Sequence, residues 1–410
     1  MHLEAFRECL KYVRFMEVFR NHRSDDTLWG VVAGQTARAF PIRTLRENPM
    51  TPEQTKLARQ RLSLGIVNVG FWVMASVCGL ALIRSGRGSI NGAETIGIAA
   101  AVLGVQAIFD ALGGGVLVPG TRPTPWAFLK SWGRGAMVHT LVVAVIGVVA
   151  TLSLQWTGGC CTGLVASTIA LSLTRRFLHA AINGGALQPV ANERGESFLT
   201  TRVNDPSFTG GLVGFGSRAG ILVPEAWCQS LPKPELQVEL SRRRWQAENG
   251  LPFRTVILLL LWNLTGCQAG ALAFDLGSLP TGTAVLGQAC WMTLWSFLGL
   301  LVLPSLGRAS VFAADRAVAS MNLDPSGWIR RLPTMTGEDG NARPWVEAIF
   351  YPIPSAARRI ESLGSPVRRP VLGDLARSQL YYSLAGLTLL GRSVHCNVGR
   401  PALWVFPPSA

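Results

Sequence analysis

Apolar runs long enough to cross a bilayer dominate the middle of this chain. Residues 64–83, 96–118, 137–154, 255–276 and 283–303 form such runs. An α-helix needs about 20 mostly apolar residues to cross the ~30 Å hydrocarbon core of a membrane. One further run, 161–173, which is the fourth in chain order, is shorter and either crosses or re-enters. We therefore expect a mainly α, polytopic membrane protein with about six transmembrane helices.

Charge placement predicts the orientation of these spans. Only 15% of the residues are charged and 49% are hydrophobic, yet the formal net charge is +14. The expected outer segments 155–160 and 277–282 contain no Lys or Arg, whereas the segment 84–95 contains Arg84 and Arg87. The expected inner segments hold nearly all the other basic residues, as the positive-inside rule requires. We expect a multi-pass protein of the cell (inner or plasma) membrane with both termini cytoplasmic, membrane lipid as a partner and no nucleic acid.

The chain divides into four parts by composition. Residues 1–63 form a basic N-terminal segment, whose end resembles a helix capped by Thr51 that continues into the first span. Residues 64–173 form a four-span region, and 174–363 form a mostly polar part interrupted by a transmembrane hairpin at 255–303. The tail, 364–410, contains an apolar stretch too short to span. It is expected to be an interfacial helix or a core helix packed on the third part.

Short motifs follow one another in a specific order within the third part. A strand and turn in FLTTRVNDPSFTGGL precede a second strand, GILVP, and an amphipathic helix within 231–250. After the hairpin come Ala313-Ala314-Asp315 and then Pro354-Ser355 followed by Arg359-Ile360.

This order resembles the integral-membrane zinc metallopeptidases of the HtpX and CAAX prenyl endopeptidase type. In that family the helix before the hairpin carries HExxH, the helix after it carries an ExxAD-like motif, and a His-Pro-Ser-x-x-x-Arg-Ile-like segment follows. The resemblance implies a cytoplasmic α+β, zincin-like peptidase domain that is split by the last hairpin. It covers roughly residues 175–365.

The residues that would bind zinc are missing from the matching positions. In HExxH two His side chains, four residues apart on one helix face, hold the metal and the Glu activates water. Aligned on the helix start, Arg242 and Gln246 occupy the His positions and Arg243 the Glu position, while Val311 occupies the position of the Glu ligand. A shift of one residue places Ser241 and Trp245 at the His positions instead. Asp315 is retained, and we expect no catalytic residue, no metal ligand and no cofactor.

The leading hypothesis is therefore a catalytically inactive peptidase homologue that acts as a membrane scaffold or regulator. Arg242, Arg243 and Arg244 are candidates for docking lipid headgroups or an acidic partner near the membrane. The strand residues Gly220, Ile221 and Leu222 are candidates for pairing with an extended segment of a membrane protein or peptide.

Two alternatives remain open. The first is an active metalloendopeptidase with displaced ligands, drawn from residues such as His179, Glu225 and Glu239. The second is a small-solute transporter or channel that uses Asp110 and His139, because polar groups within spans are expensive and often functional.

Overall fold

The computed structural model describes residues 50–86, 90–191, 195–215, 219–338, 344–367, 370 and 372–408. The chain separates into two compact units, Met1–Arg43 and Thr44–Ala410. All described residues belong to the second unit, so most of the predicted N-terminal segment lies outside them.

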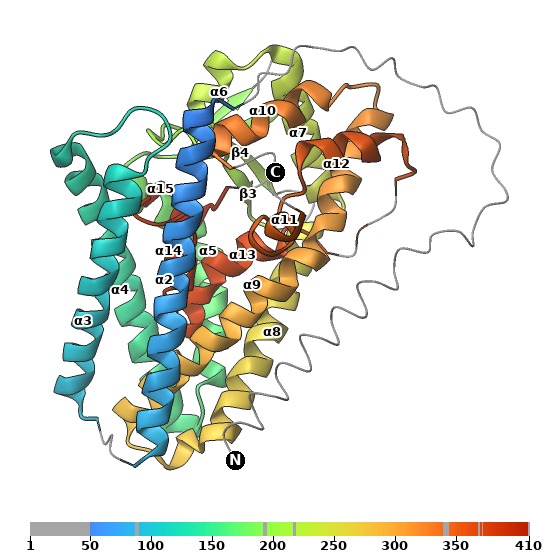
Figure 1. The fold of residues 1–410 in the computed structure, drawn as a ribbon. Helices are drawn as coiled ribbons and strands as arrows, with labels where there is room; N and C mark the ends of the chain where they lie inside the picture. The colour runs from blue at the N-terminus through green and yellow to red at the C-terminus, as the bar shows by residue number, and fades with distance from the viewer. Residues whose placement is uncertain are drawn as a thin grey trace. The chain divides into compact units, whose positions relative to one another are not determined.

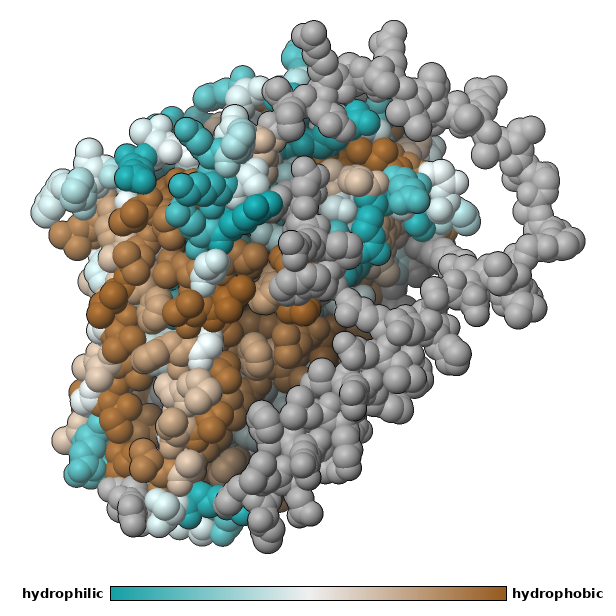
Figure 2. Space-filling model, in the orientation of Figure 1, coloured by the Kyte–Doolittle hydropathy of each residue, from teal (hydrophilic) through white to brown (hydrophobic). Residues whose placement is uncertain are grey.

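Long helices contain all or most of each of the six apolar runs. They are α2 (Pro52–Arg84), α3 (Gly92–Asp110) with a π-helical turn at Ala111–Val116, α4 (Pro125–Thr157), α5 (Cys161–Asn183), α8 (Leu251–Phe274) and α9 (Thr281–Ser320). Among the described residues, five of these helices are long and apolar enough to cross a membrane. The helix outside that set is α5, which contains the short fourth run. Apolar side chains cover the surface along α2 and α3, and polar ones gather at the end that holds the sheet (Figures 1 and 2).

The first span begins at a capped helix, as predicted. The Thr51 hydroxyl accepts a hydrogen bond from the Gln54 backbone N–H at 3.2 Å, and the Gln54 side chain accepts one from the Thr51 N–H at 2.9 Å. These reciprocal bonds satisfy donors that a helix start leaves unpaired. The helix then continues without a break to Arg84. The large apolar side chains of Val67, Met74 and Leu82 are about 60% exposed, as expected for a face in contact with lipid.

Two glycines bring α8 and α9 into close contact. A Cβ atom added at Gly266 would lie 2.3 Å from the Trp295 ring, and one at Gly270 would lie 2.2 Å from the Trp291 ring. The Trp291 indole donates to the Gly266 carbonyl at 2.7 Å. The small-xxx-small step in the fifth run therefore packs a hairpin within the molecule.

A four-stranded sheet precedes this hairpin. Its strands are β1 (Gln188–Ala191), β2 (Ser197–Thr201), β3 (Gly211–Val213) and β4 (Gly220–Pro224), in the order β1-β2-β4-β3. Strand β4 pairs parallel with β2 and antiparallel with β3. Because both of its edges are hydrogen-bonded, the predicted pairing of Gly220, Ile221 and Leu222 with a partner is wrong. The edge strands of this sheet are β1 and β3.

Short helices complete the polar part and the tail. They are α6 (Glu225–Ser230), α7 (Lys233–Glu248), α10 (Ser326–Thr336), α11 (Pro344–Phe350), α12 (Ala356–Glu361), α13 (Leu375–Tyr382), α14 (Leu390–Ser393) and α15 (Ala402–Val405). Trp227 and Trp328 pack edge to face beneath the sheet, with ring centroids 4.9 Å apart.

The tail packs inside the helical bundle. From Leu375 to Phe406 nearly every residue is buried, including Tyr381, Leu390 and Leu403. Its helices lie among α2, α5, α8 and α9 (Figure 1). Of the two placements predicted for the tail, the structure has the core helix and not the interfacial one, because apolar side chains on several faces find protein partners.

Candidate functional site between α7 and α9

The helices that would carry the two zinc motifs lie against each other. The Arg242 Nε on α7 donates to the Asp315 Oδ1 on α9 at 2.8 Å, although 73 residues separate them in the sequence. Both side chains are completely buried. The order of motifs therefore predicted the correct juxtaposition, with the hairpin α8–α9 returning the chain to α7.

Five charged side chains form one buried network at this contact. Arg242 also donates to Glu239 Oε2 at 2.7 Å, and Arg243 donates to Glu239 Oε1 at 2.6 Å. Arg359 makes two bonds to Asp315, with its Nε 2.8 Å from Oδ2 and its second nitrogen 2.9 Å from Oδ1. The Trp328 indole donates to Glu239 Oε2 at 2.8 Å. Every carboxylate oxygen in the network accepts at least one hydrogen bond.

The network carries more positive than negative charge. Three guanidinium groups (Arg242, Arg243 and Arg359) face two carboxylates (Glu239 and Asp315), all of them buried. Burial opposes ionisation of Glu239, but the guanidinium groups of Arg243 and Arg242 outweigh it and lower the pKa of that carboxyl below its usual value. Both carboxylates are therefore held as acceptors of guanidinium donors.

This arrangement does not fit a zinc ion. The Arg242 guanidinium is itself the cation that bridges the two helices, and the apolar Val311 is 7% exposed where a Glu ligand would be required. Guanidinium groups are protonated donors, and zinc needs His, Cys or carboxylate ligands with free lone pairs. Within the described part of the chain, His, Cys, Asp and Glu side chains form no group of three that could hold a metal.

The displaced-ligand candidates are also engaged elsewhere. His179 stacks on Phe208, and Glu225 accepts two hydrogen bonds from Arg202. Glu239 belongs to the buried network.

The predicted docking role of the arginine run is wrong for its first two members. Arg242 is 0% exposed and Arg243 is 2% exposed, so neither can meet a lipid headgroup or a partner. Arg244 is partly exposed and pairs with Glu196. The three arginines are adjacent in sequence, but the helix turns each one about 100° from the next, and only Arg244 reaches the surface.

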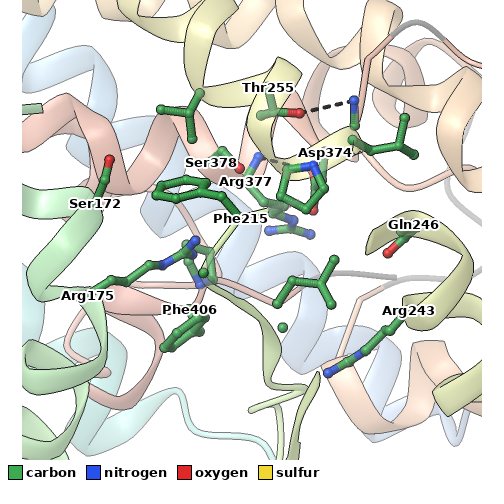
Figure 3. A pocket seen from close by; sticks show the side chains of 18 of the residues that line it. Ser172, Arg175, Phe215, Arg243, Gln246, Thr255, Asp374, Arg377, Ser378 and Phe406 are labelled. Atoms are coloured by element: carbon green, nitrogen blue, oxygen red, sulfur yellow. Dashed lines mark hydrogen bonds between the residues drawn. The ribbon is translucent and has the colours of Figure 1, made fainter. Parts of the chain in front are cut away.

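A cavity of about 90 Å³ adjoins the network. The edge strand β3 provides one wall with Gly211 and Leu212, and α7 provides Arg243 and Gln246. Arg175 from α5 lies across from Arg243 and Gln246, and Arg377 from α13 lies beside Asp374, as Figure 3 shows. Gln246, which we aligned with the second His of the family motif, therefore lines a hollow that the edge strand borders.

The cavity is basic and its charge depends on pH. Arg175, Arg243 and Arg377 line it together with one acid, Asp374, which caps α13. Burial is the main influence on Asp374 and raises the pKa of its carboxyl to about 6, although Arg377 opposes the shift. Below about pH 6 the cavity therefore loses its negative charge and becomes more attractive to anions.

Asp110 and His139 are brought together by a residue of the tail. Arg392 donates to both, with one nitrogen 3.2 Å from His139 Nδ1 and the other on Asp110 Oδ2. Asp110 also accepts from Gln106, Trp132 and the Gly399 N–H at 2.9 to 3.1 Å. With its oxygens saturated by donors, Asp110 acts as an anchor for the tail and is not arranged as an ion relay.

Sequence reasoning missed the cavity residues Asp374 and Arg377 and the anchor Arg392. A signal was present for Arg392. Arg392 directly follows an apolar stretch of the tail and requires a buried acceptor there, and Asp110 is an acid within a predicted span. The run Gly113-Gly114-Gly115 marked the docking point, because a Cβ at Gly114 would lie 1.8 Å from the Gly399 carbonyl oxygen.

Comparisons with known proteins place the fold. No known family profile matches the sequence, and no curated protein matches it. The crystal structure of S. mikatae Ste24p aligns with a TM-score of 0.54 at 10% sequence identity, covering 73% of this chain and 81% of that one. Ste24p is an integral-membrane zinc metallopeptidase of the prenyl endopeptidase type. The chain is thus a multi-pass membrane protein with a Ste24p-like fold, as its order of motifs predicted.

Proposed function

We propose that this protein is a non-catalytic relative of membrane zinc peptidases that holds an extended segment of a membrane protein beside β3, as a scaffold or regulator. One observation carries the proposal. The Arg242 guanidinium fills the place where a metal would join α7 and α9. The neighbouring cavity is lined by an edge strand and by arginine, glutamine and aspartate side chains. In this proposal the protein lacks the zinc site needed for peptide hydrolysis but has a cavity that can bind a peptide.

The edge strand supplies the binding mode. An extended peptide can add to a free strand edge through main-chain hydrogen bonds, and side-chain pockets then give selectivity. Strand β3 pairs through β4 on one side only, and Gly211 and Leu212 line the cavity. The strand that we expected to pair, β4, is interior, so β3 takes over its role in the proposal.

Charge favours an acidic segment. Of the three guanidinium groups that line the cavity, Arg243 is paired with Glu239 and Arg377 with Glu338. Arg175 contacts the Val405 carbonyl and aromatic rings, so its charge is the one that attracts an acidic segment and selects it electrostatically. We place the protein in the inner or plasma membrane with its sheet, cavity and termini cytoplasmic, because the basic residues lie on that side of the spans.

The test measures binding of a fluorescent acidic decapeptide to the full-length protein in detergent, with fluorescence polarisation as the readout. We expect saturable binding that tightens between pH 7.5 and pH 5.5 as Asp374 takes up a proton. N-methylation at alternate peptide residues should weaken binding at least tenfold, because it removes the main-chain donors that strand addition needs.

Two isosteric variants on α7 form a matched pair for this test. Gln246→Glu adds a negative charge in the cavity and should weaken binding several-fold, whereas Gln237→Glu, whose side chain bonds Ser241 outside the cavity, should leave it unchanged. Equal effects of the two variants, or indifference to N-methylation, would contradict the proposed mode of binding.

A further inference from the structure

A second cavity, of about 270 Å³, lies between α2 and α9. Leu62, Ile66 and Val69 of α2 form one wall, and Leu301 of α9 belongs to the facing one. The tail forms the floor of the groove near His395. Gly65 lets the tail backbone pack closely against α2, since a Cβ at Gly65 would lie 2.5 Å from the His395 backbone nitrogen. This groove shares Arg377 with the cavity at β3, but its other lining residues are different.

The lining of the groove is almost entirely hydrocarbon. Arg377 and His395 are its polar members. Both are held by other groups: Arg377 donates to the Cys396 sulfur at 3.0 Å and to Glu338, and His395 lies 3.9 Å from the Glu338 carboxylate. An apolar cavity of about 150 Å³ already excludes water and takes up benzene. A larger groove with apolar walls therefore favours a hydrocarbon occupant over water.

The position of the groove determines which hydrocarbon is available. Both walls belong to helices that are candidate membrane spans, and Ile66 and Leu301 are 44% and 41% exposed. From Leu62 to Gly70 the groove follows α2 for about 12 Å at ~1.5 Å per residue. That length is close to half of the ~30 Å hydrocarbon core, which is the depth of the acyl chains of one leaflet.

A positive charge stands at one end of the groove. Arg59 is exposed and precedes Leu62 by one helical turn on the same side of α2. Lys56 is exposed one turn further toward the start of the helix. Basic side chains at this level of a span attract anionic lipid headgroups by roughly 1 kcal/mol each.

We propose that the groove between α2 and α9 binds one acyl chain of an anionic membrane phospholipid, whose headgroup lies beside Arg59. The chain replaces lipid–lipid contacts with contacts to fixed apolar side chains, and the headgroup charge selects the lipid. This site is independent of the proposed peptide-binding role and does not rest on it.

Native mass spectrometry of the full-length protein, exchanged into nanodiscs of phosphatidylglycerol or phosphatidylcholine, tests the proposal. We expect one retained phospholipid per chain, with phosphatidylglycerol preferred. Gly70→Leu should fill the groove and reduce the retained fraction at least fivefold, since a Cβ at Gly70 meets no atom within 4 Å and the helix tolerates Leu better than Gly. Arg59→Gln should reduce the preference for phosphatidylglycerol about fivefold while a chain is still bound.

Gly104→Leu is the matched control. Gly104 is exposed on α3, and a Cβ there also meets nothing within 4 Å, so retention of lipid should be unchanged. Equal retention in the Gly70 and Gly104 variants would overturn the site, and so would equal retention of the two lipids by the unmodified protein. A photoreactive residue at position 301 should label phospholipid. Labelling of residues 1–49 or of another protein chain there would assign the groove to that occupant and refute the proposal.

Discussion

Replacing Asp315 by Asn is expected to destabilise the protein by about 3–5 kcal/mol, the usual effect of removing one partner from a buried ion pair. The loss is large because the network already carries three guanidinium groups and two carboxylates. Without Asp315, Arg242 and Arg359 would face each other's charge with no carboxylate between them. Denaturant unfolding of the purified protein in detergent, followed by tryptophan fluorescence, measures the change.

The same network predicts an asymmetry that serves as a control. Arg359→Met removes one positive charge and leaves Asp315 paired with Arg242, so the remaining network is neutral. Its destabilisation should be clearly smaller than that of Asp315→Asn. A larger loss of unfolding free energy in Arg359→Met than in Asp315→Asn would contradict this account, in which Asp315 stabilises the network by neutralising its excess positive charge.

Replacing Arg392 by Met is expected to release the tail from the bundle and to destabilise the protein by a similar ~3–5 kcal/mol. Arg392 is the positive partner of Asp110, and it also lies over the Trp404 ring at 4.0 Å. Without it Asp110 remains buried and unneutralised. Limited proteolysis should therefore cut within residues 372–408 of the variant under conditions that leave the unmodified tail intact.

A double variant isolates the ion pair from the packing of the tail. The double variant Asp110→Asn, Arg392→Met should lose less unfolding free energy than the sum of the two single variants, because no unpaired charge remains in it. The exposed pair Arg331–Glu235 provides the control: Arg331→Met should leave the tail protected, since surface pairs contribute about 0–1 kcal/mol. Strict additivity of the two changes would argue against direct coupling of Asp110 and Arg392.

Hydropathy and local caps predicted much of the fold. Bilayer-length apolar runs have few alternatives to helices, and Thr51, Pro52 and Gln54 define a helix start by local bonding alone. The strands at Ser197–Thr201 and Gly220–Pro224 were also recognisable from residue type and turns. The order in which strands pair was not, because the parallel pairing of β2 with β4 joins separated segments and leaves no local pattern.

The site was predicted in position but not in environment. The motif order brought α7 and α9 together in the prediction, whereas the run Arg242-Arg243-Arg244 suggested a solvated surface. A charge run gives no information about burial, because the acids that neutralise it can be distant: Asp315 is 73 residues from Arg242. The tail was ambiguous for the same reason, since its short apolar stretch fits an interface as well as a core. The burial of that stretch, and the contacts of Gly113 and Gly114 with Val398 and Gly399, become visible only in the structure.

The zinc content of the purified full-length protein tests the central claim most directly. Elemental mass spectrometry, after expression in zinc-supplemented medium and dialysis against a chelator, should find far less than one zinc per chain, because a guanidinium–carboxylate network joins α7 to α9 where a metal would have to bind. One zinc per chain that survives the chelator, and is lost in Asp315→Asn, would show that these helices do hold a metal and would contradict the account.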